Sequence, residues 1–357
     1  MDKKLKVAII GCGNISHSHI QAYLKNPQVE VIAVCDQNKQ RAEDYAKSYN
    51  IPLAFGDVDE LLKLEELDAV SVCVWNNGHN PVTVKALNAG KHVLCEKPLA
   101  MNTQEAIEMK EAAERNNKLL MVGFVRRYAN NTKVALDFKK AGTFGEFYSA
   151  KTSCLRRLGN PGGWFADKKR SGGGPLIDLG VHMIDLSRYL LGLPKAVSVY
   201  GATFNKLGSK EHIKGLKRYH PMDYNPETDV CTVEDSVMAL VRFDNGAVLQ
   251  VEASFVLNLK EGYIGLELFG DQGGIKVEPT FEIYKDTNDY LANITPVFHS
   301  SNDIFGEMFG NEINHFVDCI LNGTECISPA EDGVELMRIL DAIYESAETG
   351  HEVIIKR

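Results

Sequence analysis

Two segments of the chain hold residue types that could perform acid–base or electrostatic chemistry. In the first, Glu96-Lys97-Pro98 follows His92 to Cys95, an apolar run that predicts a buried strand. Open parallel sheets bind ligands at the carboxyl ends of their strands, so the ammonium group of Lys97 is well placed to meet a ligand. Pro98 removes a backbone donor and restricts the lysine before it. A plain turn explains the same tripeptide, and the rest of the chain decides between the two.

The second segment offers an acid and a base. A glycine run, Ser171 to Pro175, precedes an apolar stretch from Leu176 to Leu191 that predicts a helix. On this helix Asp178 and His182 are four residues apart and share one face. A histidine held by a carboxylate is a good general base near neutral pH. The glycines before the helix would let the backbone approach a ligand closely. The alternative is a core histidine beside a capping aspartate.

A glycine turn near the start of the chain is typical of a dinucleotide site. Gly11-Cys12-Gly13-Asn14-Ile15-Ser16 follows the first predicted strand and opens the first predicted helix. Gly11 would permit the tight turn, and Gly13 would let a pyrophosphate approach the backbone. The helix N-terminus then supplies amide donors. Ser16 replaces the third glycine, where a small residue suffices for packing. We therefore expect Gly11, Gly13, Asn14 and Ile15 to bind the cofactor.

Asp36 ends the second predicted strand, about 20 residues beyond the glycine turn. A carboxylate there accepts hydrogen bonds from the adenosine ribose and repels a 2′-phosphate. This favours NAD, although Lys39 and Arg41 lie close enough to leave NADP open. Asp36 could also cap the following helix, since aspartate is a good cap.

These residues require a scaffold that places strand ends together. The first 120 or so residues alternate short apolar runs with helical patterns, which predicts a parallel sheet covered on both faces. The apolar runs are Leu5 to Ile10, Val29 to Cys35, Ala69 to Val74, His92 to Cys95 and Leu119 to Val122. After about Gly142, longer strands follow one another, and Asp244-Asn245-Gly246 is typical of a hairpin turn. This second part predicts a largely antiparallel sheet. Its strands are Ala196 to Phe204, Thr232 to Phe243, Ala247 to Val256, Ile264 to Phe269 and Gly274 to Val277.

Composition narrows the function classes. With 357 residues the chain suits two domains, and a net charge of -9 argues against a protein that binds nucleic acid through phosphates. No run approaches the roughly 20 apolar residues of a membrane helix. We expect a cytoplasmic protein, because no signal peptide begins the chain and eight scattered cysteines suit free thiols. None of them forms a Cys-x-x-Cys pair, so we expect no metal site.

The order of these motifs resembles the glucose–fructose oxidoreductase/inositol dehydrogenase/rhizopine catabolism (Gfo/Idh/MocA) family. The resemblance rests on the glycine fingerprint, Glu-Lys-Pro after a later strand, and Gly-Gly-Gly-x-x-x-Asp-x-Gly-x-His, and it spans essentially the whole chain. It implies an α/β protein with a Rossmann domain over residues 1–123. It also implies a C-terminal α/β domain over residues 124–357, built on a large, mainly antiparallel open sheet. The closing helices are expected to pack near the domain junction.

The resemblance also implies roles for individual residues. Glu96 and Lys97 would contact the nicotinamide side and the substrate, and Asp178 and His182 would form the acid–base pair. Arg127 lies where related enzymes place a substrate-side arginine. Trp164 could line a sugar pocket, with ordinary core packing as the alternative.

One loop departs from the family pattern. After the strand that ends at Val74, relatives commonly show Thr-Pro-Asn-x-x-His, whereas this chain has Trp75-Asn76-Asn77-Gly78-His79-Asn80. Our interpretation keeps Asn77 as a cofactor contact. It treats His79 as a loop histidine, with a displaced equivalent of the family histidine as the alternative.

Taken together, the sequence predicts NAD-dependent oxidation of a secondary hydroxyl on a sugar, inositol or related polyol. His182 would take the hydroxyl proton, Asp178 would orient it, and Lys97 would donate to the developing alkoxide. Lys97 and His182 should then lie within the width of one small molecule. Two alternatives remain: an NAD-dependent glycosidase that acts by transient oxidation and elimination, and a non-catalytic nucleotide-sensing protein. The resemblance further implies a homodimer or homotetramer formed through the C-terminal sheet.

Overall fold

The computed structural model describes residues 4–210, 212–215, 219–299 and 301–356. They form two compact units. The first unit comprises described residues 4–128 and 301–334, and the second comprises 129–299 and 335–356. The domain boundary expected at residues 123 and 124 remains a prediction. The structure adds that a late segment of the chain packs with the first unit.

The first unit contains a six-stranded sheet in the order β3-β2-β1-β4-β5-β6, and every neighbouring pair is parallel. Most strand residues are buried, which confirms the expected parallel sheet covered on both faces. The strands are β1 (Leu5–Ile10), β2 (Val29–Cys35), β3 (Leu53–Phe55), β4 (Ala69–Val72), β5 (His92–Glu96) and β6 (Leu120–Gly123).

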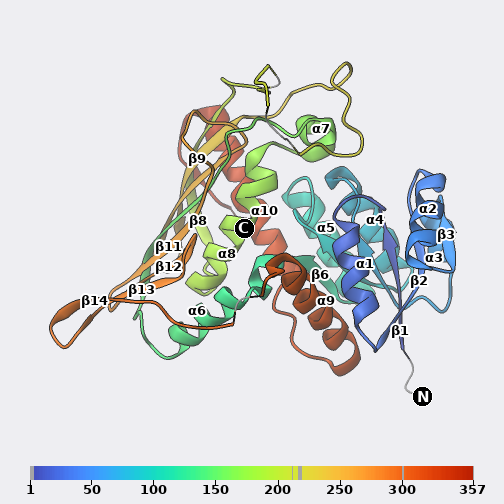
Figure 1. Cartoon of the computed structure of the whole chain (residues 1–357), viewed down its shortest axis with the longest axis horizontal. Helices are drawn as coiled ribbons and strands as arrows, with labels where there is room; N and C mark the ends of the chain where they lie inside the picture. Colours follow the sequence, from blue (N-terminus) through green and yellow to red (C-terminus); the bar gives the residue numbers. More distant parts are fainter. Residues whose placement is uncertain (1–3, 211, 216–218, 300, 357) are drawn as a thin grey trace. The chain divides into compact units, whose positions relative to one another are not determined.

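Helices from both ends of the chain cover this sheet. They are α1 (Ser16–Lys25), α2 (Lys39–Tyr49), α3 (Val58–Leu62), α4 (Asn76–Asn88), α5 (Thr103–Arg115) and α9 (Ile304–Asn322). α9 packs against α1 (Figure 1), and Ile313, Phe316 and Val317 share a buried cluster with Ile20 and Tyr23. A short 3-10 turn, Val125–Tyr128, ends the first stretch of this unit, and α10 (Ala330–Thr349) begins in its second stretch.

The second unit is built on a nine-stranded sheet in the order β14-β13-β12-β11-β7-β10-β9-β8-β15. β7 and β10 pair in parallel and the other neighbours are antiparallel, as the mainly antiparallel expectation requires. The strands are β7 (Phe147–Leu155), β8 (Ala196–Phe204), β9 (Ser236–Phe243), β10 (Val248–Ser254), β11 (Tyr263–Gly270), β12 (Gly274–Glu278), β13 (Glu282–Thr287), β14 (Tyr290–Ile294) and β15 (Val353–Ile354).

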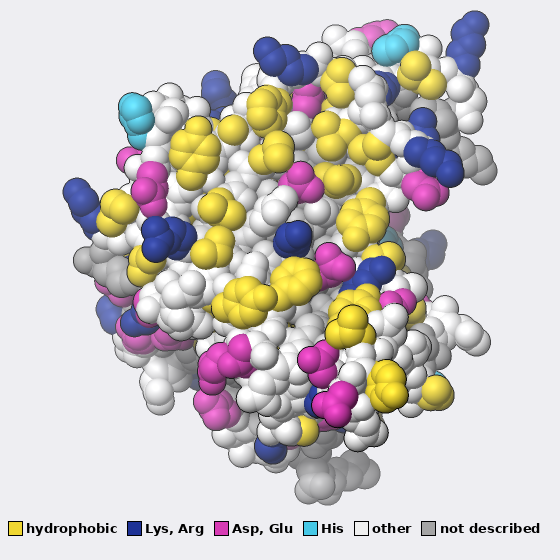
Figure 2. All heavy atoms as spheres, turned by 90° about the vertical axis from the view of Figure 1, so that its left-hand side faces the viewer, with side chains coloured by type: hydrophobic (Ala, Val, Ile, Leu, Met, Phe, Trp, Pro, Cys, Tyr) yellow, Lys and Arg dark blue, Asp and Glu magenta, His cyan; other side chains and the backbone are white. Residues whose placement is uncertain are grey.

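The two faces of this second sheet differ. α8 (Val181–Leu191) packs on one face against β7, β10 and β11. The shorter helical elements of the unit are α6 (Asn130–Lys140), a 3-10 turn (Gly163–Ala166), α7 (Lys168–Ser171) and a π-helical turn (Leu176–Gly180). On the opposite face Tyr200 pairs with Leu240, and both side chains are exposed. Figure 2 shows hydrophobic side chains gathered over the side of the molecule where these strands lie, with a few charged groups between them.

The hairpin expected at Asp244-Asn245-Gly246 joins β9 to β10, and Gly246 adopts a φ of 85°. In the part of the chain that the structure describes, no helix is long and apolar enough to cross a membrane.

Candidate active site

Three of the expected site residues lie at the same edge of the first sheet. Gly11 directly follows β1, Asp36 follows β2, and Lys97 follows β5, so all three stand at carboxyl ends of parallel strands. The strand order reverses between β1 and β4, and in such sheets ligands bind beside this reversal. The first unit therefore has the architecture of a dinucleotide site.

The two glycines of the turn have different local roles. Gly11 has a φ of 96°, and a Cβ built on it would lie 2.4 Å from the carbonyl oxygen of Cys73. Packing against Cys73 and the positive φ therefore require glycine at position 11. A Cβ on Gly13 would meet nothing within 4 Å. The space over Gly13, at the start of α1, fits the approach of a pyrophosphate to backbone amides.

Asp36 braces the glycine turn. Its Oδ2 accepts a hydrogen bond of 2.9 Å from the backbone N–H of Cys12, and its Oδ1 accepts one of 2.8 Å from the N–H of Asn38. The Arg41 guanidinium lies 3.5 Å from Oδ2. The side chain of Asn38, and not that of Asp36, caps α2, because it accepts from the N–H of Arg41. The capping alternative for Asp36 is therefore wrong.

Glu96 lies in a buried polar network beneath Lys97. One carboxylate oxygen is 2.8 Å from His19 Nε2, and the other accepts a 3.1 Å hydrogen bond from the N–H of Lys97. His19 Nδ1 continues to Ser71 Oγ at 3.2 Å, and this hydroxyl lies 2.9 Å from Tyr23 OH. Burial alone would raise the pKa of Glu96, but the hydrogen bond and charge of His19, followed by the charge of Lys97, hold the pKa below its usual value. The nicotinamide contact expected of Glu96 remains a prediction.

Lys97 itself is partly buried, and its peptide bond to Pro98 is cis. The carbonyl oxygen of Pro98 lies 2.7 Å from His79 Nδ1, and His79 Nε2 lies 3.1 Å from the carbonyl oxygen of Val74. His79 thus links the end of the β4 strand to the turn that carries Lys97.

His79 also corrects our interpretation of the altered loop. It is buried inside α4, which begins at Asn76, and so it is not a loop histidine. Asn76 is buried, whereas Asn77, the expected cofactor contact, is exposed. The Asn-x-x-His spacing of the family pattern is met by Asn76 and His79. Pro81 lies within α4, five residues after its start.

Glu312, on α9, is a buried carboxyl group that the sequence interpretation overlooked. Among the described residues neither of its carboxyl oxygens has a hydrogen-bond partner. Burial, together with the charge of Glu96, raises the pKa of Glu312 well above its usual value. The sequence could have indicated Glu312, because this acidic residue lies among the apolar residues Phe309, Ile313 and Phe316.

Arg127 is held by buried contacts within the first unit. Its side chain is fully buried and donates to Asp332 Oδ2 at 2.7 Å and to the carbonyl oxygen of Ile327. The guanidinium also lies over the ring of Phe124. The described contacts therefore make Arg127 part of an internal ion pair of the first unit. The substrate contact expected of Arg127 stays a prediction.

In the second unit, Asp178 and His182 lie on consecutive helical segments. Asp178 is in the π-helical turn and His182 is in the first turn of α8, so the predicted helix exists but widens at its start. Both side chains are partly exposed, while Leu179, Val181 and Met183 are buried. Asp178 and His182 therefore share the accessible stripe of this helix. π-Helical turns are rare and frequently occur at functional sites.

The glycines before this helix do not leave space for a ligand. A Cβ on Gly173 would lie 1.9 Å from the hydroxyl of Tyr344, and one on Gly174 would lie 2.5 Å from the carbonyl oxygen of Glu234. The expected close approach of a ligand to Gly173 and Gly174 is therefore wrong. These glycines instead allow tight packing within the unit.

A single carboxylate anchors the segment that leads to Asp178. Glu234 Oε2 accepts a 3.0 Å hydrogen bond from the N–H of Gly174, and Oε1 accepts from the N–H of Leu176 at 3.2 Å. The hydroxyl of Tyr344 donates to the same Oε1 at 2.9 Å. No sequence pattern links these residues, because Tyr344 lies on α10 and Glu234 precedes β9.

Trp164 stacks on Phe165 with ring centroids 4.0 Å apart, and Phe165 contacts Tyr219 edge-on. The same region holds an ion pair between Arg170 and Asp223 at 2.7 Å. The described parts of the 206–230 segment therefore pack against the segment around Trp164.

Comparisons with known proteins agree with this architecture. A family model described as an oxidoreductase family with an NAD-binding Rossmann fold matches residues 5–124. The model of the C-terminal alpha/beta domain of the same family matches residues 140–355. The chain belongs to the Gfo/Idh/MocA oxidoreductase family. It is an NAD-binding oxidoreductase, as the glycine turn and the strand order indicate.

Several named relatives cover nearly the whole chain. D-Glucoside 3-dehydrogenase of Escherichia coli (strain K12) is 35% identical over 98% of this chain and 97% of its own length. The scyllo-inositol 2-dehydrogenase (NAD(+)) of Bacillus subtilis (strain 168) is 26% identical over 90% of this chain and 88% of its own. A solved structure of levoglucosan dehydrogenase in complex with NADH and L-sorbose has a TM-score of 0.86. It is 25% identical and covers 99% of this chain and 100% of that one.

Proposed function

We propose that this enzyme oxidises a secondary hydroxyl of a sugar ring, glycoside or related polyol with NAD⁺. The proposal rests on the partial exposure of three polar side chains, Lys97, Asp178 and His182, whose neighbours in the chain are mostly buried. Lys97 is partly buried at the cofactor edge of the first sheet, and Asp178 and His182 share the accessible stripe of their helix. The relatives named for D-glucosides, levoglucosan and scyllo-inositol support the substrate class.

The chemistry divides between these residues. His182 accepts the hydroxyl proton as general base, and Asp178 orients the imidazole and stabilises its protonated form. Lys97 donates to the oxygen as negative charge develops there, which lowers the barrier where charge appears. A nicotinamide cofactor held at this site would supply the hydride acceptor for the carbon that bears the hydroxyl. The alcohol thus loses one proton and one hydride and becomes a ketone.

The cofactor preference follows from Asp36. Its carboxylate stands at the end of β2, where the adenosine ribose binds in this architecture, and it would repel a 2′-phosphate. Arg41 lies 3.5 Å from that carboxylate. Its guanidinium would bind the 2′-phosphate of NADP if the charge of Asp36 were removed. We therefore propose NAD⁺ as the preferred cofactor.

The test is a steady-state assay of NAD⁺ and NADP⁺ reduction with D-glucosides, levoglucosan, inositols and aldoses. We expect turnover with NAD⁺ on at least one ring alcohol. Lys97→Ala and His182→Asn should each lower kcat by about 10²–10⁴-fold, the usual contribution of a positioned acid or base. The exposed residues Lys47 and His351 offer matched controls, and Lys47→Ala and His351→Asn should retain activity.

Wild-type rates in both Lys97→Ala and His182→Asn would reject the role assignment. Aglycone release from glycosides without net NADH would indicate the glycosidase alternative. Tight NAD⁺ binding without turnover on the whole panel would indicate a nucleotide-sensing protein.

We also propose that the open face of the second sheet forms a dimer or tetramer interface in a cytoplasmic enzyme. Met238, Leu240 and Tyr200 are exposed on this face, whereas Val237, Ala239 and Val241 are buried beneath it. Leu240→Asp should lower the mass measured by sedimentation while the circular-dichroism spectrum stays unchanged. A wild-type monomer in the same measurement would contradict the interface.

A further inference from the structure

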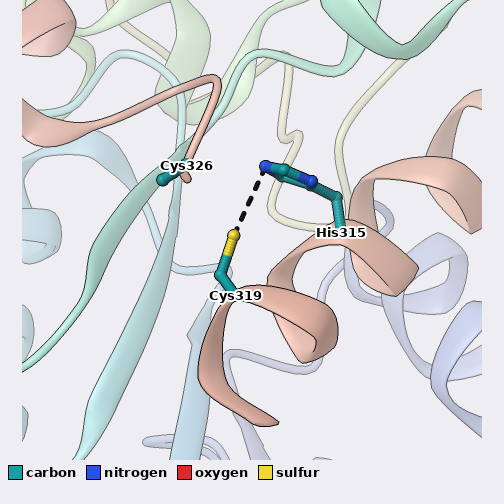
Figure 3. Close-up of side chains that lie close together, drawn as sticks. All are labelled: His315, Cys319 and Cys326. Carbon is teal, nitrogen blue, oxygen red and sulfur yellow. Dashed lines mark hydrogen bonds between the residues drawn. The ribbon is translucent and has the colours of Figure 1, made fainter. Parts of the chain in front are cut away.

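A second group of reactive side chains lies away from the hydride-transfer residues. His315 and Cys319 are four residues apart on α9 and so face the same side of the helix. Cys326 lies in the connection that follows α9. Figure 3 shows His315 and Cys319 pointing toward one another from the helix, with Cys326 on the neighbouring segment. The His315 Nε2 and Cys319 Sγ atoms are 3.4 Å apart, and all three candidate ligand atoms lie within 4.8 Å of one another.

The turn that brings Cys326 back is defined by several contacts. α9 ends at Asn322, and its C-cap residue Gly323 has a φ of 70°, in the left-handed region. Asp318 accepts hydrogen bonds from the side chains of Asn322 and Thr324, which hold the turn against the helix. The N–H of Ile327 donates to His315 Nε2 at 3.1 Å. Because a backbone N–H can only donate, this nitrogen is unprotonated and its lone pair accepts the Ile327 bond.

We propose that His315, Cys319 and Cys326 bind a divalent metal ion of the zinc class. Two thiolates and one imidazole are the ligand types that zinc prefers, and two thiolates balance its charge. Tetrahedral zinc with these ligands has ligand–ligand distances of about 3.6–3.8 Å, from bond lengths of about 2.3 Å to sulfur and 2.0–2.1 Å to nitrogen. The Nε2–Sγ distance of 3.4 Å between His315 and Cys319 is slightly below this range, and the other two pairs, which lie within 4.8 Å, need to close by no more than about 1 Å. The ion would replace the Ile327 N–H as the partner of Nε2.

The fourth position can be filled from solvent. All three side chains are partly exposed, and a shallow surface depression lined by Lys25, Asn26, Asn314, His315 and Asp318 reaches the imidazole. An ion therefore has an entry path, and water completes the tetrahedron.

The ion would stabilise the edge of the first sheet at β6 by linking it to α9. The segment after Cys326 pairs with β6, since the N–H of Val122 donates to the carbonyl oxygen of Ser328 at 2.9 Å and Met121 forms a bridge with Pro329. Joining Cys326 to α9 through a metal would tie this edge to the helix. The proposal is independent of the substrate and of hydride transfer.

The experiment is a Co²⁺ titration of the reduced, chelator-treated full-length chain, followed by competition with Zn²⁺. We expect one Co²⁺ per chain, with a thiolate-to-cobalt charge-transfer band and the visible bands of a tetrahedral ion. Changing residues outside the ligand shell already costs about 10–100-fold in metal affinity, so Cys319→Ser and Cys326→Ser should each cost at least tenfold. Cys231, exposed and outside the cluster, gives the control Cys231→Ser, which should bind Co²⁺ like the wild type.

A second measurement guards against misfolded variants. Zn²⁺ should raise the melting temperature of the wild type and of Cys231→Ser but leave that of Cys319→Ser unchanged. Absence of the sulfur charge-transfer band in the wild type would overturn the proposal. A Cys319–Cys326 disulfide in the protein as purified, with no metal bound after its reduction, would also overturn it.

Discussion

The two units each contain a glycine-rich segment that leads into a helix, and each segment is held by a carboxylate from elsewhere in the chain. In the first unit Asp36 accepts from the N–H of Cys12, and in the second Glu234 accepts from the N–H of Gly174. The surroundings differ. The space over Gly13 is open, whereas Gly173 and Gly174 are packed against the unit's own atoms.

This difference shows that glycine content alone does not identify a ligand site. In the first unit the open glycine exposes the N-terminus of α1 to a ligand. In the second, close packing fixes the helix that presents Asp178 and His182. The turn at Gly13 leaves room for a ligand, whereas the turn at Gly173 and Gly174 fixes the position of Asp178 and His182.

The strongest test of this contrast is a pair of substitutions within the first turn. Gly11→Ala forces a side chain into a positive-φ position against Cys73 and should cost about 2–4 kcal/mol of unfolding free energy. Gly13→Ala should change that free energy by no more than about 0.5 kcal/mol and should weaken NAD⁺ binding. Urea unfolding and calorimetric NAD⁺ titration measure the two quantities. Equal stability losses in both variants would contradict the distinction.

The anchor of the second turn should have an intermediate effect. Glu234→Gln removes charge-assisted hydrogen bonds to Gly174 and Leu176 and should cost about 1–2 kcal/mol. Because the affected helix carries Asp178 and His182, kcat should fall while the affinity for NAD⁺ remains near that of the wild type. Tyr344→Phe keeps both backbone contacts of Glu234 and serves as the control, with kcat close to wild type. If Tyr344→Phe lowers kcat as much as Glu234→Gln does, the carboxylate is not the anchor.

A pH dependence of stability is assigned to the first unit. Burial, then the charge of Lys118, lowers the pKa of His92 to about 4, and His92 Nδ1 accepts from the N–H of Leu119 at 3.0 Å. As the pH falls, His92 therefore becomes protonated in the unfolded chain before it does in the folded chain. Stability should drop from about pH 6.5 towards pH 4 and show no further contribution from His92 below that.

Unfolding free energies of His92→Gln across this pH range should show a shallower slope than the wild type. The slope should not vanish, because burial also lowers the pKa values of His79 and His315. His351→Asn, at an exposed position, should keep the full slope. An unchanged slope in His92→Gln would exclude His92 as a source.

The sequence predicted the parallel sheet well because buried strands such as Leu120–Gly123 are continuous apolar runs. It missed β13 and β14, in which Glu282, Lys285 and Asp286 give no apolar pattern, and the short β3, which has only three residues. The family resemblance and the NAD-binding fold were confirmed by the comparisons. The placement of Lys97 opposite His182 stays a prediction.

Side-chain partners were the least predictable part of the site. The ion pair of Arg127 depends on Asp332, and the anchor of Asp178 depends on Glu234 and Tyr344, all distant in sequence. The π-helical turn at Leu176–Gly180 has no periodicity that a residue pattern could reveal. Such contacts arise only when segments far apart in the chain are folded together.

The packing of α9 on α1 has a consequence for biosynthesis. The strands β1 to β6 and α1 leave the ribosome long before Ile313, Phe316 and Val317, which complete their buried cluster. The nascent first unit therefore carries a bare apolar surface until almost the whole chain has been translated, a stage at which chaperones protect such surfaces. A chain truncated after residue 299 should accordingly bind a hydrophobic dye that the full-length protein does not.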